Sequence, residues 1–131
     1  MTNPKLAVSA SVVRYLLALD VFRDADGIRT IDVARYLNIK KPSAHTMLNN
    51  LKDADVLTKD NDGVAHLTDY GSELTKQYHR YYCAVSAALV QCLPQTADIK
   101  NASCALIAEL SEPVLEELCG QCGGDAAPNV S

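Results

Sequence analysis

The sequence contains no apolar run that approaches the ~20 residues a membrane-spanning helix requires. Its N-terminal stretch also lacks the basic region that opens a secretory signal peptide, and Arg14 interrupts the apolar residues that follow. We therefore expect a cytoplasmic protein that does not enter a membrane. In that compartment the 5 cysteines are expected to be free, metal-bound or redox-active rather than paired in structural disulfides.

The common arrangements of catalytic residues are also missing. The sequence has no Ser/His/Asp or Cys/His/Asn order, no glycine-rich loop that would cradle a phosphate, and no carboxylate pair beside an evident cleft. Cys119 and Cys122 form a Cys-x-x-Cys pair, but the α/β context of a thiol oxidoreductase is absent. We therefore predict that the chain is not an enzyme.

What the sequence does have is an uneven distribution of charge. The net charge of the 131 residues is −4, and acidic residues predominate after Ala97. Residues Ile28 to Lys52 instead contain five basic residues and one acidic residue, so their formal charge is +4. A basic segment in an acidic chain argues against nonspecific coating of nucleic acid, but it is compatible with one focused DNA-binding surface.

The same basic segment has the pattern of two short helices joined by a tight turn. Thr30 is placed to cap the first helix. Asn38 and Ile39 break the apolar periodicity, and Pro42 restarts it because proline suits a first helical turn. The buried side of the second helix is predicted to comprise Ala44, Met47, Leu48 and Leu51. This order predicts a helix-turn-helix, whose second helix enters the major groove, although similar hairpins also occur in proteins that bind no DNA.

The flanking segments complete a winged-helix order. Residues 1–7 are interpreted as a loose lead-in and residues 9–22 as a helix. After the helix-turn-helix, two β-compatible runs flank Asn61-Asp-Gly63, which is a strong hairpin signal. Lys59 and His66 on this hairpin either approach phosphate or the minor groove, or are simply solvated.

A long helix is predicted from its cap at Thr68 to just before Pro94. Its roughly 25 residues would span ~37 Å. Apolar residues alternate four and three apart along it, as in a coiled-coil seam: Leu74, Tyr78, Tyr81, Val85, Ala88 and Cys92. We interpret the seam as a homodimer interface, because a winged helix has little core left to cover it. Burial inside the same chain is the alternative.

Two shorter helices are predicted after the long one, the first from about Ala97 and the second after Ser111. The predicted fold class is therefore mainly α, a winged helix-turn-helix followed by a long linker helix and a helical dimerisation region. The predicted domains are a DNA-binding domain over residues 1–67, a helical dimerisation and effector region over residues 68–120, and a flexible tail over residues 121–131.

Seven short segments, taken in order, carry a resemblance to a known family. They are Arg14-Tyr-Leu16, Ile31-Asp-Val-Ala34, Pro42-Ser-Ala44, Leu67-Thr-Asp-Tyr-Gly71, Tyr78-His-Arg80, Cys104 and Ser111. Over roughly residues 12–119 the chain resembles the diphtheria-toxin-repressor and manganese-transport-regulator family of metal-dependent bacterial repressors. The resemblance implies a homodimeric repressor that reads a palindromic operator in double-stranded DNA, with Mn²⁺ or Fe²⁺ as corepressor. We expect the family's optional SH3-like domain to be absent.

The resemblance also implies which residues meet DNA. Pro42, Ser43 and Thr46 match positions at the base edges, where a hydroxyl can donate or accept and a methyl group can contact thymine. The residues better placed for phosphates are Lys40, Lys41, His45, Asn49, Asn50 and Lys52. The family often has glutamine where this chain has Thr46, so the operator sequence does not follow from the resemblance.

The positions that bind the corepressor depart from the family pattern. The residues that replace the family's ligands are Arg14, Leu17, Cys83, Lys100 and Ile107-Ala108. His79 is retained, and Cys104 stands where the family uses cysteine or glutamate. A hard Mn²⁺ site cannot be assembled from this set.

A softer site remains as a hypothesis. His79 and Cys83 are four residues apart and share a helix face, and with Cys104 they would form a nitrogen and sulfur set suited to Zn²⁺, Cu⁺ or an iron–sulfur centre. Cys119 and Cys122 would complete it. The alternatives are a thiol-redox switch, favoured by Lys100 near the cysteines, and thiols that only pack in a core. A third class is a winged-helix interaction module that docks through its acidic C-terminal half without reading DNA.

Overall fold

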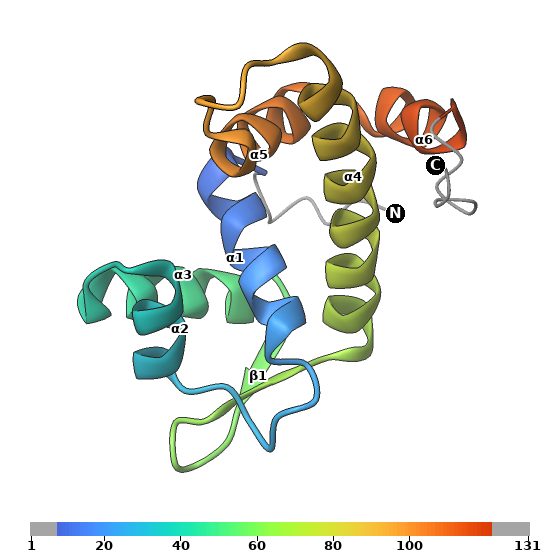
Figure 1. Cartoon of the computed structure of the whole chain (residues 1–131). Helices are drawn as coiled ribbons and strands as arrows, with labels where there is room; N and C mark the ends of the chain where they lie inside the picture. The colour runs from blue at the N-terminus through green and yellow to red at the C-terminus, as the bar shows by residue number, and fades with distance from the viewer. Residues whose placement is uncertain (1–7, 122–131) are drawn as a thin grey trace. The chain divides into compact units, whose positions relative to one another are not determined.

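The computed structural model describes residues 8–121. The predicted lead-in and nearly all of the predicted tail lie outside the described residues. The elements in chain order are α1 (Ala10–Val21), α2 (Thr30–Leu37), α3 (Lys41–Asp53), β1 (Leu57–Lys59), β2 (Ala65–Leu67), α4 (Asp69–Cys92), α5 (Ile99–Glu109) and α6 (Glu112–Gln121). The predicted fold class, a winged helix-turn-helix followed by a helical region, is confirmed (Figure 1).

The described chain divides into two compact units. The winged-helix unit contains residues 15–76, and the helical unit contains residues 8–14 and 77–121. Helices α1 and α4 each supply residues to both units. The functional division predicted at residue 67 remains a prediction. Within the described residues, no helix is both long enough and apolar enough to cross a membrane.

Helices α2 and α3 form the predicted helix-turn-helix. Asn38 ends α2 in the left-handed conformation, with φ 57° and ψ 50°, which asparagine adopts more readily than most residues. The Ile39 N–H donates to the Ala34 carbonyl and closes the turn. Pro42 lies in the first turn of α3, as predicted. Helix α3 packs against both α2 and β1, so it is supported by the first helix of the helix-turn-helix and by the hairpin.

The predicted N-cap of α2 is wrong. The helix begins at Thr30 itself, and Arg29 occupies the N-cap position without a capping hydrogen bond from its side chain. A cap residue must have non-helical backbone angles so that its side chain can reach back to the first N–H groups. Thr30 is already helical and follows the N-cap position by one residue, so its hydroxyl does not cap the helix.

The predicted hairpin is present between α3 and α4. Leu57 pairs with Leu67 and Lys59 with Ala65 in an antiparallel register. The Asp60 carboxylate accepts the N–H groups of Asp62 and Val64 at 2.9 and 3.0 Å, which closes the turn. These short hydrogen bonds fix the loop from within, and they hold the negative charge of Asp60 at its tip.

Helix α4 starts where its predicted cap lies. The Thr68 hydroxyl accepts the Gly71 N–H at 2.9 Å and donates to the Asp55 carbonyl at 2.6 Å. Gly71 lies against the main chain of Val56, so closely that a Cβ at this position would overlap the Val56 carbonyl oxygen. The main chain immediately before β1 and the first turn of α4 therefore meet backbone to backbone.

In the helical unit, α5 and α6 lie beside α4, on opposite sides of it in the view of Figure 1. Helix α6 is fastened by Glu116. Arg80 donates to both Glu116 carboxylate oxygens at 3.1 and 3.0 Å, and the fully buried Tyr81 donates its hydroxyl to the same carboxylate at 2.7 Å. Burial raises the pKa of Tyr81 above its ordinary value, so its hydroxyl stays a donor.

The predicted dimer seam needs correction. Leu74, Tyr78, Tyr81 and Val85 are all at most 7% exposed within the single chain. They are therefore covered by their own chain, which was the alternative considered from the sequence. Of the six predicted interface residues, only the half-buried Ala88 and the exposed Cys92 remain available to a partner.

We expect replacement of Glu116 by glutamine to destabilise the protein at neutral pH but much less in acid. The hydrogen bonds from Arg80, and then that from Tyr81, lower the pKa of Glu116. A carboxyl group with a lowered folded-state pKa stabilises the fold above its unfolded pKa of about 4.3, and this contribution is lost as the pH falls through the lowered value. Urea unfolding of wild type and variant at pH 7 and pH 3 measures the difference.

The matched control is Glu117→Gln, which removes the same charge from the next residue of α6. Its side chain is exposed, so we expect little change in the free energy of unfolding. An E116Q protein as stable as wild type at pH 7, or one whose deficit persists at pH 3, would contradict the role of this carboxylate.

Candidate nucleic-acid interface

The residues predicted to meet DNA lie on the solvent-exposed side of α3 and at its N-terminus. Its apolar residues Ala44, Leu48 and Leu51 are fully buried. The exposed predicted contacts are Lys40, Lys41, Pro42, Ser43, His45, Thr46, Asn50 and Lys52, whereas Asn49 is half-buried. The structure therefore brings the predicted DNA-binding residues together on one helix.

The N-terminus of α3 concentrates positive charge. Lys40 is the N-cap residue and Lys41 the first residue of the helix, and both are exposed. The first turn of a helix also carries unpaired N–H groups and the positive end of the helix dipole. The two ammonium groups and the N-terminal end of the helix dipole are all positive, so the start of α3 is suited to bind a phosphate group.

Thr46 is oriented by its own helix. Its hydroxyl donates to the Pro42 carbonyl, one turn earlier, at 3.0 Å. That bond occupies the hydroxyl proton, so the side chain offers a methyl group and acceptor lone pairs to a ligand. In the major groove these suit the thymine methyl group and the amino groups of adenine or cytosine.

Asn49 was predicted to contact a phosphate, but in the structure its side-chain amide contacts other side chains of the protein. Lys59 on β1 donates its Nζ to Asn49 Oδ1 at 2.8 Å, and Asn49 Nδ2 lies 3.2 Å from His45 Nε2. No sequence pattern predicts this chain of contacts, because Lys59 is ten residues away from Asn49 and reaches it only through the folded hairpin. His45 itself remains exposed.

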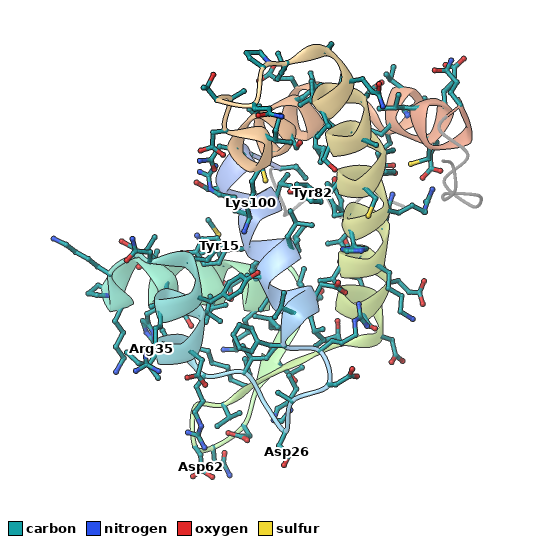
Figure 2. All side chains as sticks on the ribbon, viewed as in Figure 1. Tyr15, Asp26, Arg35, Asp62, Tyr82 and Lys100 are labelled. Carbon is teal, nitrogen blue, oxygen red and sulfur yellow. The ribbon has the colours of Figure 1, made fainter. Side chains whose placement is uncertain are left out.

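The hairpin tip is acidic. His66 Nε2 lies 3.4 Å from Asp60 Oδ2, and the backbone N–H of Val64 is the main cause of the lowered pKa of Asp60. Asp62 follows in the turn and is exposed. Figure 2 shows Asp62 and Asp26 projecting from the ends of two loops of the winged-helix unit, whereas Arg35 projects from α2. Two exposed carboxylates thus lie at loop ends of this unit, away from α3 in the sequence.

The predicted effector residues are only partly brought together. His79 Nε2 and Cys83 Sγ lie 3.6 Å apart, and both residues are exposed. Cys104 is fully buried, and burial raises its thiol pKa although Arg14 and Lys100 act in the opposite direction. Among residues 8–121, no three His, Cys, Asp or Glu side chains are placed to hold one metal ion. The predicted set of His79, Cys83 and Cys104 is therefore not assembled.

The Cys-x-x-Cys prediction lies only partly within the described residues. Cys119 is buried on α6, and its thiol points to the Arg80 carbonyl at 3.9 Å. A buried thiol is disfavoured as a thiolate, which is the form that binds a metal. Cys122 lies outside the described residues.

Arg14 and Lys100, two of the residues that stand where the resemblance implies metal ligands, are cations near Asp98. Arg14 on α1 donates to Asn101 Oδ1 on α5 at 3.2 Å, and Asn101 Nδ2 donates to Asp98 at 2.6 Å. Hydrogen bonds from the backbone and the side chain of Asn101 are the main causes of the lowered pKa of Asp98, and Arg14 and Lys100, the latter labelled in Figure 2, act in the same direction. Two cationic side chains oppose a divalent ion, and the nearby carboxylate is already engaged as the cap of α5. These residues do not fit Mn²⁺.

The sequence matches no protein-family model. A search of curated proteins also found no significant match. Solved structures with a similar fold do exist. The manganese regulator SloR aligns over 91% of this chain and 55% of its own, with 19% identity and a TM-score of 0.67. The manganese-activated repressor ScaR in its apo form aligns over 82% and 52%, with 22% identity and a TM-score of 0.57.

A protein of unassigned function, SSo2273 from Sulfolobus solfataricus, aligns over 88% of this chain and 89% of its own, with 18% identity and a TM-score of 0.65. The chain thus spans about half the length of the two regulators and most of SSo2273. The similarity extends from the winged helix into the helical region. The chain has the fold shared by the metal-dependent repressors that resemble the diphtheria toxin repressor.

Proposed function

We propose that the protein is a sequence-specific DNA-binding transcriptional regulator, acting as a repressor. The observation that carries the proposal is the exposed, basic side of α3, a helix whose opposite side buries Ala44, Leu48 and Leu51 completely. Lys40, Lys41 and Lys52 supply charge for phosphates, and Ser43 and Thr46 supply groups for base edges. The similarity in fold to a manganese-activated repressor supports the same role.

Selection from a random DNA library with the full chain tests this proposal. We expect enrichment of a palindromic sequence, and affinity for it that falls steeply as salt rises, by a slope of about −0.9 per phosphate contact. Weak binding without sequence preference at moderate salt would instead identify a winged-helix module that docks on protein partners.

Thr46→Ala is expected to change which DNA sequence is preferred, with little effect on the salt dependence. The substitution removes the methyl group and the hydroxyl lone pairs that face away from the bond to Pro42. Loss of one base contact costs about 1–3 kcal/mol at the affected base pair and leaves the phosphate contacts intact. Repeating the library selection with the variant measures the effect, and an unchanged preference would remove Thr46 from the base-reading set.

We propose a homodimer, but through a different surface from the predicted seam. The helical unit exposes large apolar side chains, with Val90 on α4 61% exposed, Val114 on α6 45% and Leu106 on α5 36%. Apolar side chains on three helices of one unit support an interface there. Sedimentation equilibrium of wild type and Val90→Glu tests this, and an unchanged dimer in the variant would exclude the Val90 surface.

A metal or related effector remains part of the proposal for the helical region, although the described residues assemble no three-ligand site. One observation favours a thiol-based effector instead, because the exposed Cys83 thiol lies beside the His79 imidazole. Elemental analysis of anaerobically purified protein for Mn, Fe, Zn, Cu and sulfide separates the two. Stoichiometric metal lost in Cys83→Ser supports a soft site, and metal-free protein with oxidant-sensitive DNA binding supports a thiol switch.

A further inference from the structure

The hairpin of the winged-helix unit is connected to the recognition helix by side chains, and its tip has the wrong charge for DNA. We propose that the β1–β2 hairpin positions the recognition helix α3 and does not itself contact DNA. This inference rests on the proposed function, since it assigns a role to each part of the DNA-binding unit.

The connection runs through Asn49. Lys59 belongs to β1, and its ammonium group donates to Asn49 Oδ1 at 2.8 Å. The other end of the same amide lies 3.2 Å from His45 Nε2, one turn earlier on α3. Lys59 is half-buried, whereas the phosphate candidates Lys40, Lys41 and Lys52 are exposed. The ammonium group of Lys59 is therefore engaged by a side chain of α3.

These contacts also determine a protonation state. An ammonium group can only donate, so it must face the amide oxygen of Asn49. The amide nitrogen then faces His45 and can only donate to it. His45 Nε2 must accept this hydrogen bond, so its proton is carried by Nδ1. Lys59 thus sets the tautomer of an exposed side chain on the recognition helix without touching it.

The rest of the hairpin is unsuited to a phosphate backbone. Within Leu57–Leu67, Lys59 is the one lysine or arginine, against Asp60 and Asp62 at the tip. His66 is paired with Asp60. The neighbouring loop is joined to the hairpin by the bridge between Ile28 and Ala65. It adds the exposed Asp24 and Asp26, with the exposed Arg29 at its end and Arg23 paired with Asp20. The carboxylates at the hairpin tip would be repelled by DNA.

A salt titration of DNA binding separates positioning from contact. With a sequence enriched from the random library, Lys59→Met is expected to weaken binding by about threefold to tenfold while the slope of log K against log salt stays unchanged. Lys52→Met, the matched control on the exposed side of α3, is expected to reduce that slope by about 0.9. A similar loss of slope in Lys59→Met would overturn the proposal.

A double-mutant cycle tests whether Lys59 acts through Asn49. Asn49→Leu removes the acceptor and the donor together, so it should weaken binding about as much as Lys59→Met, and the double variant no further. Additive effects would show that the two side chains act separately. Asp62→Asn should change the affinity less than about twofold at 0.15 M salt, because a tip held off the DNA is screened over about 8 Å. A larger gain would place the tip on the DNA.

Proton and nitrogen NMR of the DNA-free protein provides a readout that does not depend on the proposed function. At about pH 8, where imidazoles are neutral, we expect the Nδ1–H tautomer at His45, and a mixture of tautomers in Asn49→Leu and in Lys59→Met. Wild-type protein with the proton on Nε2 would overturn the connection. Selection that enriches no DNA while the tautomer is as expected would instead refute the DNA-binding function.

Discussion

Replacement of Gly71 by alanine is expected to destabilise the protein by about 3 kcal/mol, the upper end of the usual cost of overpacking. The added methyl group would overlap the Val56 carbonyl oxygen and approach Leu67. The obstacle is main chain, which cannot turn aside as a side chain can. The same carbonyl accepts the N–H of Thr68, so moving it disturbs the junction between the hairpin and α4. Urea unfolding followed by circular dichroism measures the loss.

Gly120→Ala is the matched control. Gly120 lies in α6, and nothing lies within 4 Å of the position that its Cβ would occupy. Alanine is favoured over glycine in a helix by up to about 1 kcal/mol, so this variant should be as stable as wild type or slightly more so. If both variants lose stability equally, the contact with Val56 is not the cause.

Removal of both lysines at the start of α3 is expected to weaken DNA binding about 100-fold at low salt. Lys40 and Lys41 are exposed next to the positive end of the helix, where each can neutralise one phosphate. The slope of log K against log salt should fall by about 1.8 for the two contacts, and all DNA sequences should be weakened alike. Titrations of Lys40→Ala/Lys41→Ala protein at several salt concentrations measure both quantities.

Lys76→Ala serves as the control for charge alone, because Lys76 is exposed on α4. Its loss changes the net charge without removing a proposed phosphate contact, and it should leave the salt slope unchanged. A double-lysine variant that keeps the wild-type slope would show that the start of α3 does not meet the phosphates.

Local signals predicted most of the fold. Pro42 marks the start of α3, Asn61-Asp-Gly63 lies in the hairpin turn, and Thr68 caps α4, because each of these depends on the backbone of its own neighbourhood. Thr30 failed as a cap because helix ends shift by a residue without a change in the apolar pattern. Elements could thus be predicted, whereas their exact ends could not.

The seam on α4 shows what a periodicity leaves open. An alternation of four and three residues places side chains on one face of a helix, and this face can be covered by another chain or by its own. Tyr78, Tyr81 and Val85 are covered by their own chain. The spacing predicted burial correctly for the first four residues of the seam but not for the exposed Cys92, and it holds no information about which chain provides the cover.

Some features of the candidate site could be predicted from the sequence and others could not. The exposed side of α3 could be predicted, because the inward positions of Ala44, Leu48 and Leu51 follow from spacing on one helix. The pairing of Lys59 with Asn49 and the inward position of Cys104 could not. Both depend on how separate elements pack, and neither residue is marked by its neighbours in the sequence.

The contact between Arg14 and Asn101 differs from a metal bridge in one respect that matters for signalling. A metal ion joins two helices only while its free concentration exceeds its dissociation constant, so its occupancy reports the surroundings. Arg14 is part of the chain, and a guanidinium stays charged at every physiological pH. The group that links α1 to α5 is therefore present whatever the supply of metal ions. Unlike a metal bridge, this contact cannot report the concentration of a metal ion through its own occupancy.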